Sequence, residues 1–104
     1  MEPGWYEYAA SNPAYERTPV YVAGTVWNAS GTQSRLLVFR VTGHAKPHSE
    51  RDTLSPGQAR YFKKNVTRCA GRPTVNRNGT DCAAAVADAE ERARVELAAD
   101  RDDR

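Results

Sequence analysis

Apolar residues recur at every second position along two neighbouring segments near the middle of the chain. In residues 20–27, VYVAGTVW, one face would hold Val20, Val22, Gly24 and Val26, and the other face is also largely apolar. A period of two is typical of a β-strand, and two apolar faces indicate a strand that is covered on both sides. Gly24 interrupts the run, which indicates a β-bulge or the close approach of another group.

The second segment, residues 34–42, places Leu37, Phe39 and Val41 on one face, which we expect to be the core face. Residues 28–33, NASGTQ, join the two segments and contain the Asn, Ser and Gly residues that favour a reversal of the chain. The pattern therefore predicts an antiparallel hairpin. Because an isolated hairpin is marginal in water, further strands or a helix must cover it.

A third strand is predicted after residues 55–58, Ser-Pro-Gly-Gln, because Pro and Gly at the two central positions are typical of a type II turn. In the residues that follow, alternation would bury Phe62 and Val66 and leave Lys63 and Lys64 in solvent.

The polar loop at residues 43–52, GHAKPHSERD, is predicted to be a solvent-facing crossover between two sheets. It contains His44 and His48, but Pro47 and the lack of further ligands at a suitable spacing argue against a metal site.

These features resemble a known family. Residues 22–30 follow the pattern apolar-any-Gly-any-Val-any-Asn-any-Ser, a hydrophobic strand comes next, and residues 54–58, LSPGQ, follow with Phe62 beyond. Over about half of the chain the sequence resembles small bacterial immunoglobulin-like β-sandwich modules of the FxLYD kind, although Arg-Val-Thr stands after Phe39 where the family has Tyr-Asp. The resemblance implies an immunoglobulin-like antiparallel β-sandwich that serves as an extracytoplasmic binding or spacing domain, not as an enzyme.

The chain of 104 residues is expected to form one domain with three parts: an N-terminal arm at 1–19, the sandwich core at 20–80, and a C-terminal helix and acidic tail at 81–104. The arm is rich in aromatic residues, namely Trp5, Tyr6, Tyr8 and Tyr15. This composition suits burial equally well in two places: on the sandwich itself, closing an open edge, or on a neighbouring subunit.

The C-terminal segment is rich in strong helix formers, and Thr80 or Asp81 can cap the helix. Charged pairs at i,i+4 are predicted between Asp88 and Arg92 and between Glu90 and Arg94. A narrow apolar stripe suits close packing on a sheet or on another helix; it consists of Cys82, Val86, Ala89, Ala93 and Leu97.

Cys69 and Cys82 are the two cysteines, and a Gly-, Pro- and Asn-rich segment separates them. We predict a disulfide between them, because closing a loop of about 14 residues stabilises a small fold by about 3 kcal/mol. The alternative is a pair of free thiols, as a reducing compartment would give.

The net charge of +2 conceals an asymmetry, since residues 1–80 carry a charge of +6 and residues 81–104 a charge of −4. Residues 53–80 contain no acidic side chain but six basic ones, Arg60, Lys63, Lys64, Arg68, Arg72 and Arg77. This block could meet the phosphates of a nucleic acid, with Tyr61 as a stacking ring. The alternative is that it forms a solvated surface or complements the acidic tail.

No nucleophile with a base and no glycine-rich phosphate loop is evident, and paired carboxylates occur only in the C-terminal helix, where they suit a solvated face, so neither an enzyme nor a cofactor site is predicted. No run of about 20 apolar residues indicates a membrane span, and the first residues lack the features of a secretory signal. We therefore predict a non-enzymatic assembly module that docks onto other protein subunits, such as a capsid decoration or tail component of a bacteriophage. It would be found in the virion or outside the cell, and in the cytoplasm during assembly.

The predicted partner-binding residues come from the arm and from the basic block; they are Trp5, Tyr6, Tyr8, Tyr15, Arg60, Lys63, Lys64 and Arg68. A nucleic-acid-binding module that uses residues 60–77 and an extracytoplasmic immunoglobulin-like binding domain are the alternatives.

Overall fold

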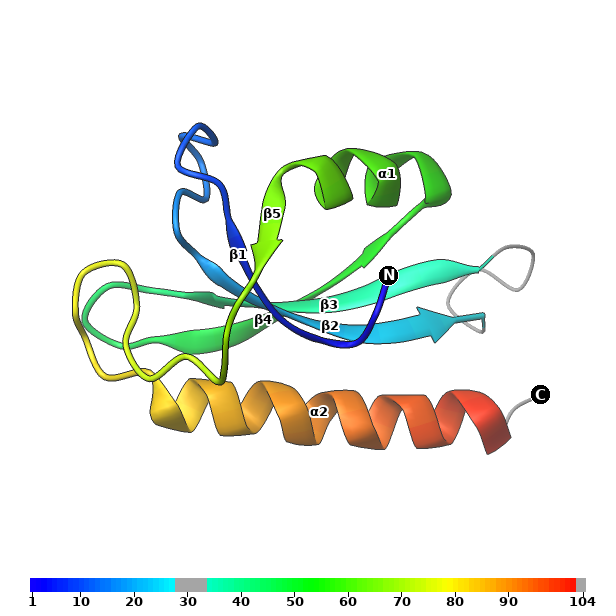
Figure 1. Ribbon diagram of the computed structural model, residues 1–104. Coiled ribbons are helices and arrows are strands. Elements are labelled where there is room, and N and C mark those ends of the chain that lie inside the picture. Colours follow the sequence, from blue (N-terminus) through cyan, green and yellow to red (C-terminus); the bar gives the residue numbers. More distant parts are fainter. Residues whose placement is uncertain (28–33, 103–104) are drawn as a thin grey trace.

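The computed structural model describes residues 1–27 and 34–102, which form five β-strands and two α-helices (Figure 1). The elements are β1 (Gly4–Tyr8), β2 (Pro19–Val26), β3 (Arg35–Thr42), β4 (His48–Leu54), α1 (Pro56–Lys64), β5 (Val66–Arg68) and α2 (Ala83–Asp102). The strands pair antiparallel in the order β4-β3-β2-β1-β5. The predicted turn at residues 28–33 lies outside the described residues.

A mainly β fold with an antiparallel sheet and a C-terminal helix is confirmed. The immunoglobulin-like sandwich is not confirmed, because the described strands form one open sheet instead of two facing sheets. The two helices cover the sheet from opposite sides, with α1 above and α2 below it in Figure 1. A sheet between two helices has two hydrophobic cores, and this explains why the central strands are apolar on both faces.

The bulge predicted at Gly24 is confirmed, and it divides β2 between the two cores. The pairing register with β3 shifts between Val22 and Gly24. As a result, Val20 and Val22 face the α1 side, whereas Val26 faces the α2 side, although all three occupy even positions. An inserted residue moves the side chains that follow it to the other face of a strand, so the prediction of one common face for these valines was wrong.

In β3, Leu37, Phe39 and Val41 form the core face against α2, as predicted. The opposite face is buried as well, because Leu36 and Val38 pack in the core beneath α1. The hairpin of β2 and β3 is therefore the centre of the molecule rather than one wall of a sandwich.

The predicted third strand is wrong, because residues 56–64 form helix α1. Ser55 caps this helix: its Oγ accepts a hydrogen bond from the Gln58 backbone N–H at 3.3 Å, and the Gln58 side chain accepts one from the Ser55 N–H at 2.9 Å. Pro56 occupies the first turn, where a missing N–H costs nothing. The Ser-x-x-Gln capping box was the signal that the type II turn interpretation overlooked. Phe62 is buried as predicted, but from a helix, while Val66 is half-buried on β5.

The aromatic arm packs on its own molecule. β1 pairs with β2 on one side and with β5 on the other, so it lies inside the sheet. Trp5 enters the core beneath α2, while Tyr6 and Tyr8 enter the core beneath α1. Of the two placements considered for the arm, the structure therefore shows burial on the chain itself.

The predicted crossover loop is wrong in its second half, since His48–Leu54 is strand β4 and pairs with β3 at one edge of the sheet. Polar residues dominate this strand because edge strands are partly solvated, and polar or charged side chains there discourage pairing with other chains.

Helix α2 packs its predicted stripe on the sheet, with Cys82, Val86, Ala89 and Ala93 buried and Leu97 partly buried. Asp81 accepts a hydrogen bond from the Ala83 N–H at 2.9 Å and so caps the helix start. The predicted i,i+4 pairs within the helix are not formed. Asp88 and Arg92 instead both bind Ser49 of β4, and Glu90 binds Trp5 and Arg72. The charges of the helix therefore anchor it to the rest of the fold.

The predicted disulfide is not formed, and Cys69 and Cys82 are free cysteines. Burial is the main cause that raises the pKa of both thiols. The segment between them is closed by backbone contacts instead: Cys82 donates to the Thr74 carbonyl at 3.0 Å, and Val75 forms a bridge with Asp81.

Candidate functional site

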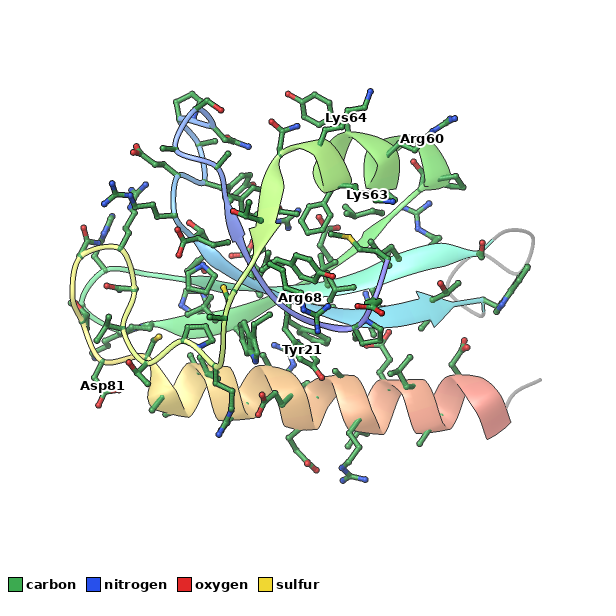
Figure 2. The ribbon with its side chains drawn as sticks, viewed as in Figure 1. Tyr21, Arg60, Lys63, Lys64, Arg68 and Asp81 are labelled. Atoms are coloured by element: carbon green, nitrogen blue, oxygen red, sulfur yellow. The ribbon has the colours of Figure 1, made fainter. Side chains whose placement is uncertain are left out.

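Helix α1 presents an exposed cationic face, which consists of Arg60, Lys63 and Lys64. Figure 2 shows Arg60 and Lys64 pointing outward from the helix, away from the sheet. The helix carries no acidic residue, and within residues 1–27 and 34–102 these three side chains form no ion pair. The cationic face therefore remains available to a partner.

The other three members of the predicted basic block are engaged inside the molecule. Arg68 donates to the Tyr6 hydroxyl at 3.1 Å and to the Pro3 carbonyl at 3.2 Å, and its guanidinium lies 5.4 Å from the centre of the Tyr6 ring. Arg72 pairs with Glu90 at 2.7 Å. Arg77 donates to the Glu16 carbonyl at 3.4 Å. Among the described residues, the members of the block on α1 are therefore those that make neither an ion pair nor a side-chain hydrogen bond.

A hollow of about 460 Å³ lies along one flank of α1. We call it the aromatic hollow; it is lined by Tyr8, Asn12, Tyr15, Arg40, Asp52, Leu54, Gly57, Gln58, Tyr61, Phe62 and Asn65. Tyr61 is 70% exposed and Tyr15 is 37% exposed, so both rings can touch a bound molecule. A concave, mainly apolar site with a few polar groups is the usual form of a ligand pocket.

Arg40 supplies the cation of the aromatic hollow and is only 9% exposed. Its Nε donates to the Tyr8 hydroxyl at 2.9 Å, and its Nη1 donates to Asp52 Oδ2 at 2.8 Å. The guanidinium also lies over the Tyr15 ring, 5.0 Å from its centre. Burial acts to lower the pKa of Arg40, but the contacts with Tyr8 and Asp52 outweigh it, so the pKa is raised and the group stays charged. In the described part of the chain, Nη2 makes no hydrogen bond.

The Tyr8 hydroxyl makes the stability of this cluster sensitive to high pH. Burial is the main cause that raises the pKa of Tyr8 above its ordinary value of 10.0. Because the folded state then holds the proton more tightly than the unfolded chain, the stabilisation is complete below about pH 10 and is lost as the pH rises through the folded-state pKa.

We therefore expect the free energy of unfolding of the native protein to fall more steeply above about pH 10 than that of Tyr8→Phe. At pH 7 the variant should be less stable by about 1–3 kcal/mol, because Arg40 loses a buried hydrogen bond. Denaturant unfolding at neutral and alkaline pH measures both effects. Cys69 and Cys82 ionise in both proteins, so their contribution cancels in the comparison. Parallel pH curves for the two proteins would contradict the assignment to Tyr8.

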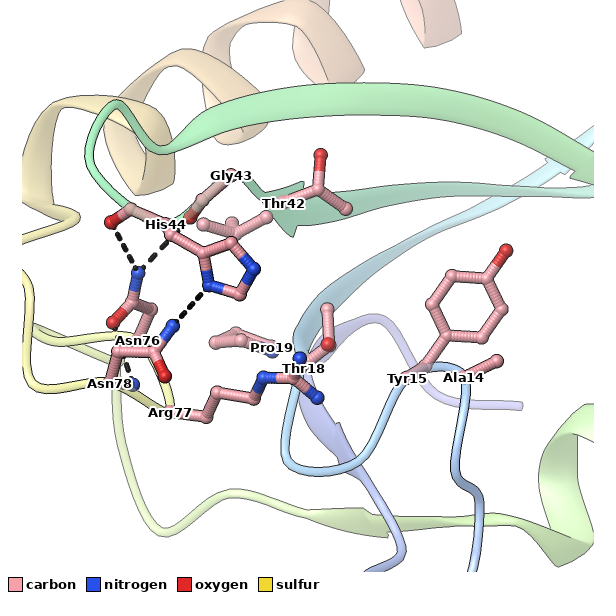
Figure 3. Close-up of a pocket in the computed structure, with 11 residues that line it drawn as sticks. Ala14, Tyr15, Thr18, Pro19, Thr42, Gly43, His44, Asn76, Arg77 and Asn78 are labelled. Carbon is pink, nitrogen blue, oxygen red and sulfur yellow. Dashed lines mark hydrogen bonds between the residues drawn. The ribbon is translucent and has the colours of Figure 1, made fainter.

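A second, smaller hollow of about 190 Å³ lies on the other side of Tyr15 (Figure 3). At one end of it, Asn76 donates to the carbonyls of Gly43 and His44 at 3.2 and 3.4 Å, and Asn78 Nδ2 lies 2.5 Å from His44 Nδ1. These contacts tie the segment after β5 to the turn between β3 and β4. Since the polar groups are satisfied by one another, we interpret this hollow as a structural joint.

The structure separates the predicted partner-binding residues into two groups. Trp5, Tyr6 and Tyr8 are buried in the cores, and of these three Tyr8 also lines the aromatic hollow. The accessible ones are Tyr15, Arg60, Lys63, Lys64 and Arg68. Tyr15 lines the aromatic hollow, Arg60 and Lys63 line a separate hollow on another flank of α1, and Arg68 binds Tyr6 and Glu2 of its own chain. Sequence reasoning missed Arg40 and Asp52. The available signal was Arg40 itself, a charged residue between Phe39 and Val41 in an otherwise apolar strand. This signal indicates a buried cation only if both faces of β3 are covered, which the sequence did not show.

In the part of the chain that the structure describes, His, Cys, Asp and Glu side chains form no group of three or more that could hold a metal ion. No helix among these residues is long and apolar enough to cross a membrane. Comparison with family models, with curated proteins and with solved structures finds no match. The resemblance to FxLYD modules therefore stays a prediction.

Proposed function

We propose that this protein is a non-enzymatic nucleic-acid-binding module that holds a single strand along α1. The observation that carries the proposal is a group of three cations on one short helix, beside the exposed ring of Tyr61. These cations, Arg60, Lys63 and Lys64, form no ion pair with any residue that the structure describes. Cations bind the phosphate backbone, and an exposed aromatic ring stacks on unpaired bases. Bases in a duplex are stacked on one another, so the ring favours a single strand.

Helix stability alone explains this arrangement poorly. Lys63 and Lys64 lie in the last turn, where the helix dipole favours cations. Arg60, however, is four residues before Lys64, and two like charges at this spacing destabilise a helix by a few tenths of a kcal/mol. No acidic residue of α1 relieves the repulsion. An external anion would relieve it, which supports binding of a polyanion at this face.

Removing two of these cations tests the proposal. We expect Arg60→Gln with Lys64→Gln to weaken binding of a short fluorescent oligothymidylate by up to about thirty-fold at low salt, since each of the two exposed charge contacts contributes at most about 1 kcal/mol. The plot of log affinity against log salt should have a slope of about −2 for the native protein and about −0.7 for the variant, given roughly 0.7 per neutralised phosphate. Fluorescence anisotropy at several salt concentrations measures both quantities.

The matched control removes the same charge elsewhere: Lys46→Gln in the exposed turn between β3 and β4, with Arg94→Gln on α2. It should keep the affinity of the native protein. If the control loses as much affinity as the α1 variant, binding depends on net charge and the assignment to α1 is wrong. If the native protein does not bind at low salt, the proposed function is wrong.

A second candidate is the assembly module that docks onto other protein subunits, including the virion role. The observation that favours it is the exposed Val95 on the outer side of α2, in a shallow, mainly apolar hollow that also involves Glu91, Arg92, Glu96 and Ala99. An apolar side chain in a polar rim is typical of protein interfaces. Light scattering of the native protein and of Val95→Glu tests self-assembly through this surface. If both proteins are monomers at high concentration, self-assembly through Val95 is wrong.

A further inference from the structure

We propose that the aromatic hollow takes a guanine base of the bound strand, with Arg40 and Asp52 reading its hydrogen-bonding edge. This inference rests on the proposed function and assigns a base preference to it. The position, the shape and the polarity of the hollow each support the assignment of guanine.

The position follows from the periodicity of α1. One flank of the helix lines the aromatic hollow through Gly57, Gln58, Tyr61, Phe62 and Asn65. Lys64 is a neighbour of this flank on the helix surface, since it lies three residues after Tyr61. Arg60 and Lys63 lie further round the helix and line a separate hollow with Pro56 and Ala59. A strand with a phosphate on Lys64 would therefore bring a neighbouring base to Tyr61 and into the hollow beside it.

The shape suits a flat ring. The walls include the rings of Tyr15 and Tyr61, and the lining also contains Leu54 and Phe62. An aromatic wall binds a base by stacking, which contributes about 1–3 kcal/mol per base. The smaller hollow of about 190 Å³ shares Tyr15 but lacks Tyr61, and its other ring, that of His44, is held by Asn78.

The charged side chains of the hollow disfavour a bare anion as its ligand. Asp52 is paired with Arg40, so the two charges compensate each other, and a phosphate or carboxylate entering the hollow would meet the Asp52 carboxylate. The pair instead presents a donor next to an acceptor. Arg40 is only 9% exposed, and its Nη2 donates to no group among the residues that the structure describes. A neutral ligand with complementary groups on one edge satisfies both.

Guanine has such an edge. Its O6 can accept from Arg40 Nη2, while its N1–H and N2–H can donate to the Asp52 carboxylate. Each oxygen of Asp52 keeps a lone pair for this purpose, because Oδ2 accepts from Arg40 and Oδ1 from the Thr53 N–H at 2.8 Å. The Asp52 side chain is 42% exposed and can be reached. Adenine, cytosine and thymine lack two adjacent donors beside an acceptor.

The test compares oligothymidylate with the same strand carrying one central guanosine, by fluorescence anisotropy. We expect the guanosine to raise the affinity of the native protein about five- to hundred-fold, the discrimination usual for a bidentate base contact. Inosine at the same position lacks the N2 amino group and should give an intermediate affinity. Asp52→Asn should remove the guanosine preference, since an amide accepts through only one oxygen.

Glu50→Gln is the matched control, because it removes one carboxylate from the same strand and should keep the preference. Since inosine probes the contact without any change to the protein, the test does not depend on how Asp52→Asn folds. Salt-dependent binding of both strands with equal affinity would overturn the guanine assignment and leave the proposed function intact. Binding of neither strand at low salt, or equal binding of a polyglutamate peptide, would overturn both.

Discussion

Replacing Trp5 by alanine is expected to lower the free energy of unfolding by about 3–5 kcal/mol, the usual cost of removing a large buried aromatic side chain. Trp5 is 6% exposed, and its ring lies 5.1 Å from that of Tyr21. Its Nε1 donates to Glu90 of α2 at 2.9 Å, and its carbonyl accepts from the Cys69 N–H at 2.9 Å. One side chain near the N-terminus thus joins the sheet to the C-terminal helix, so its loss weakens both.

Chemical denaturation of the native protein and of Trp5→Ala measures this loss. Tyr61→Ala is the control, because an exposed ring should contribute less than about 0.5 kcal/mol to stability. Trp5→Phe keeps most of the buried ring and should lie between the native protein and Trp5→Ala, which preserves a measurable value if the alanine variant does not fold. A small and concentration-dependent effect would instead mean that the arm packs on a neighbouring molecule.

Phe62→Ala is expected to cost a similar amount, about 3–5 kcal/mol, and to release α1 from the sheet. Phe62 is the buried side chain of this helix, and its ring meets the ring of Tyr8 edge-on at 5.5 Å. A helix of nine residues is not stable on its own in water. Without the Phe62 anchor, the cations of α1 lose their fixed arrangement, so oligonucleotide binding should weaken along with stability.

Amide hydrogen exchange combined with the oligothymidylate titration measures this effect. In Phe62→Ala the amides of residues 56–64 should exchange much faster, whereas those of β2 and β3 should change less, because α1 contacts one face of the sheet only. Phe62→Leu fills most of the same space and should retain both protection and binding. Unchanged protection of α1 in the alanine variant would show that contacts other than Phe62 hold this helix.

Local residue patterns were sufficient to predict those elements whose structure depends on one segment and its neighbour in the sequence. The alternation in residues 20–27 and 34–42 predicted the paired strands β2 and β3. Gly24 predicted the bulge, and the alanine-rich stripe predicted a helix packed closely on a flat surface. Each of these depends on side-chain periodicity and backbone preference, which are written in consecutive residues.

Residues 55–66 show why other features required the tertiary structure. Ser-Pro-Gly-Gln fits a type II turn as well as a helix cap. Burial of Phe62 is compatible with the period of a strand and with the period of a helix. The choice depends on Phe62 packing on Tyr8, a partner 54 positions earlier in the chain. The thiols of Cys69 and Cys82 pose the same problem, since the composition of the segment between them is compatible with a bridge and with free cysteines.

The sequence by itself determined the two central strands, the C-terminal helix and the basic character of residues 53–80, because these depend on short-range pattern and composition. Only the tertiary structure decided that α1 and α2 cover opposite faces, and that β5 returns to pair with β1. The same strand order brings Tyr8, Tyr15, Arg40, Asp52 and Tyr61 to one hollow. Contacts between residues so far apart in the chain arise from the sum of many weak packing interactions, and no local pattern encodes them.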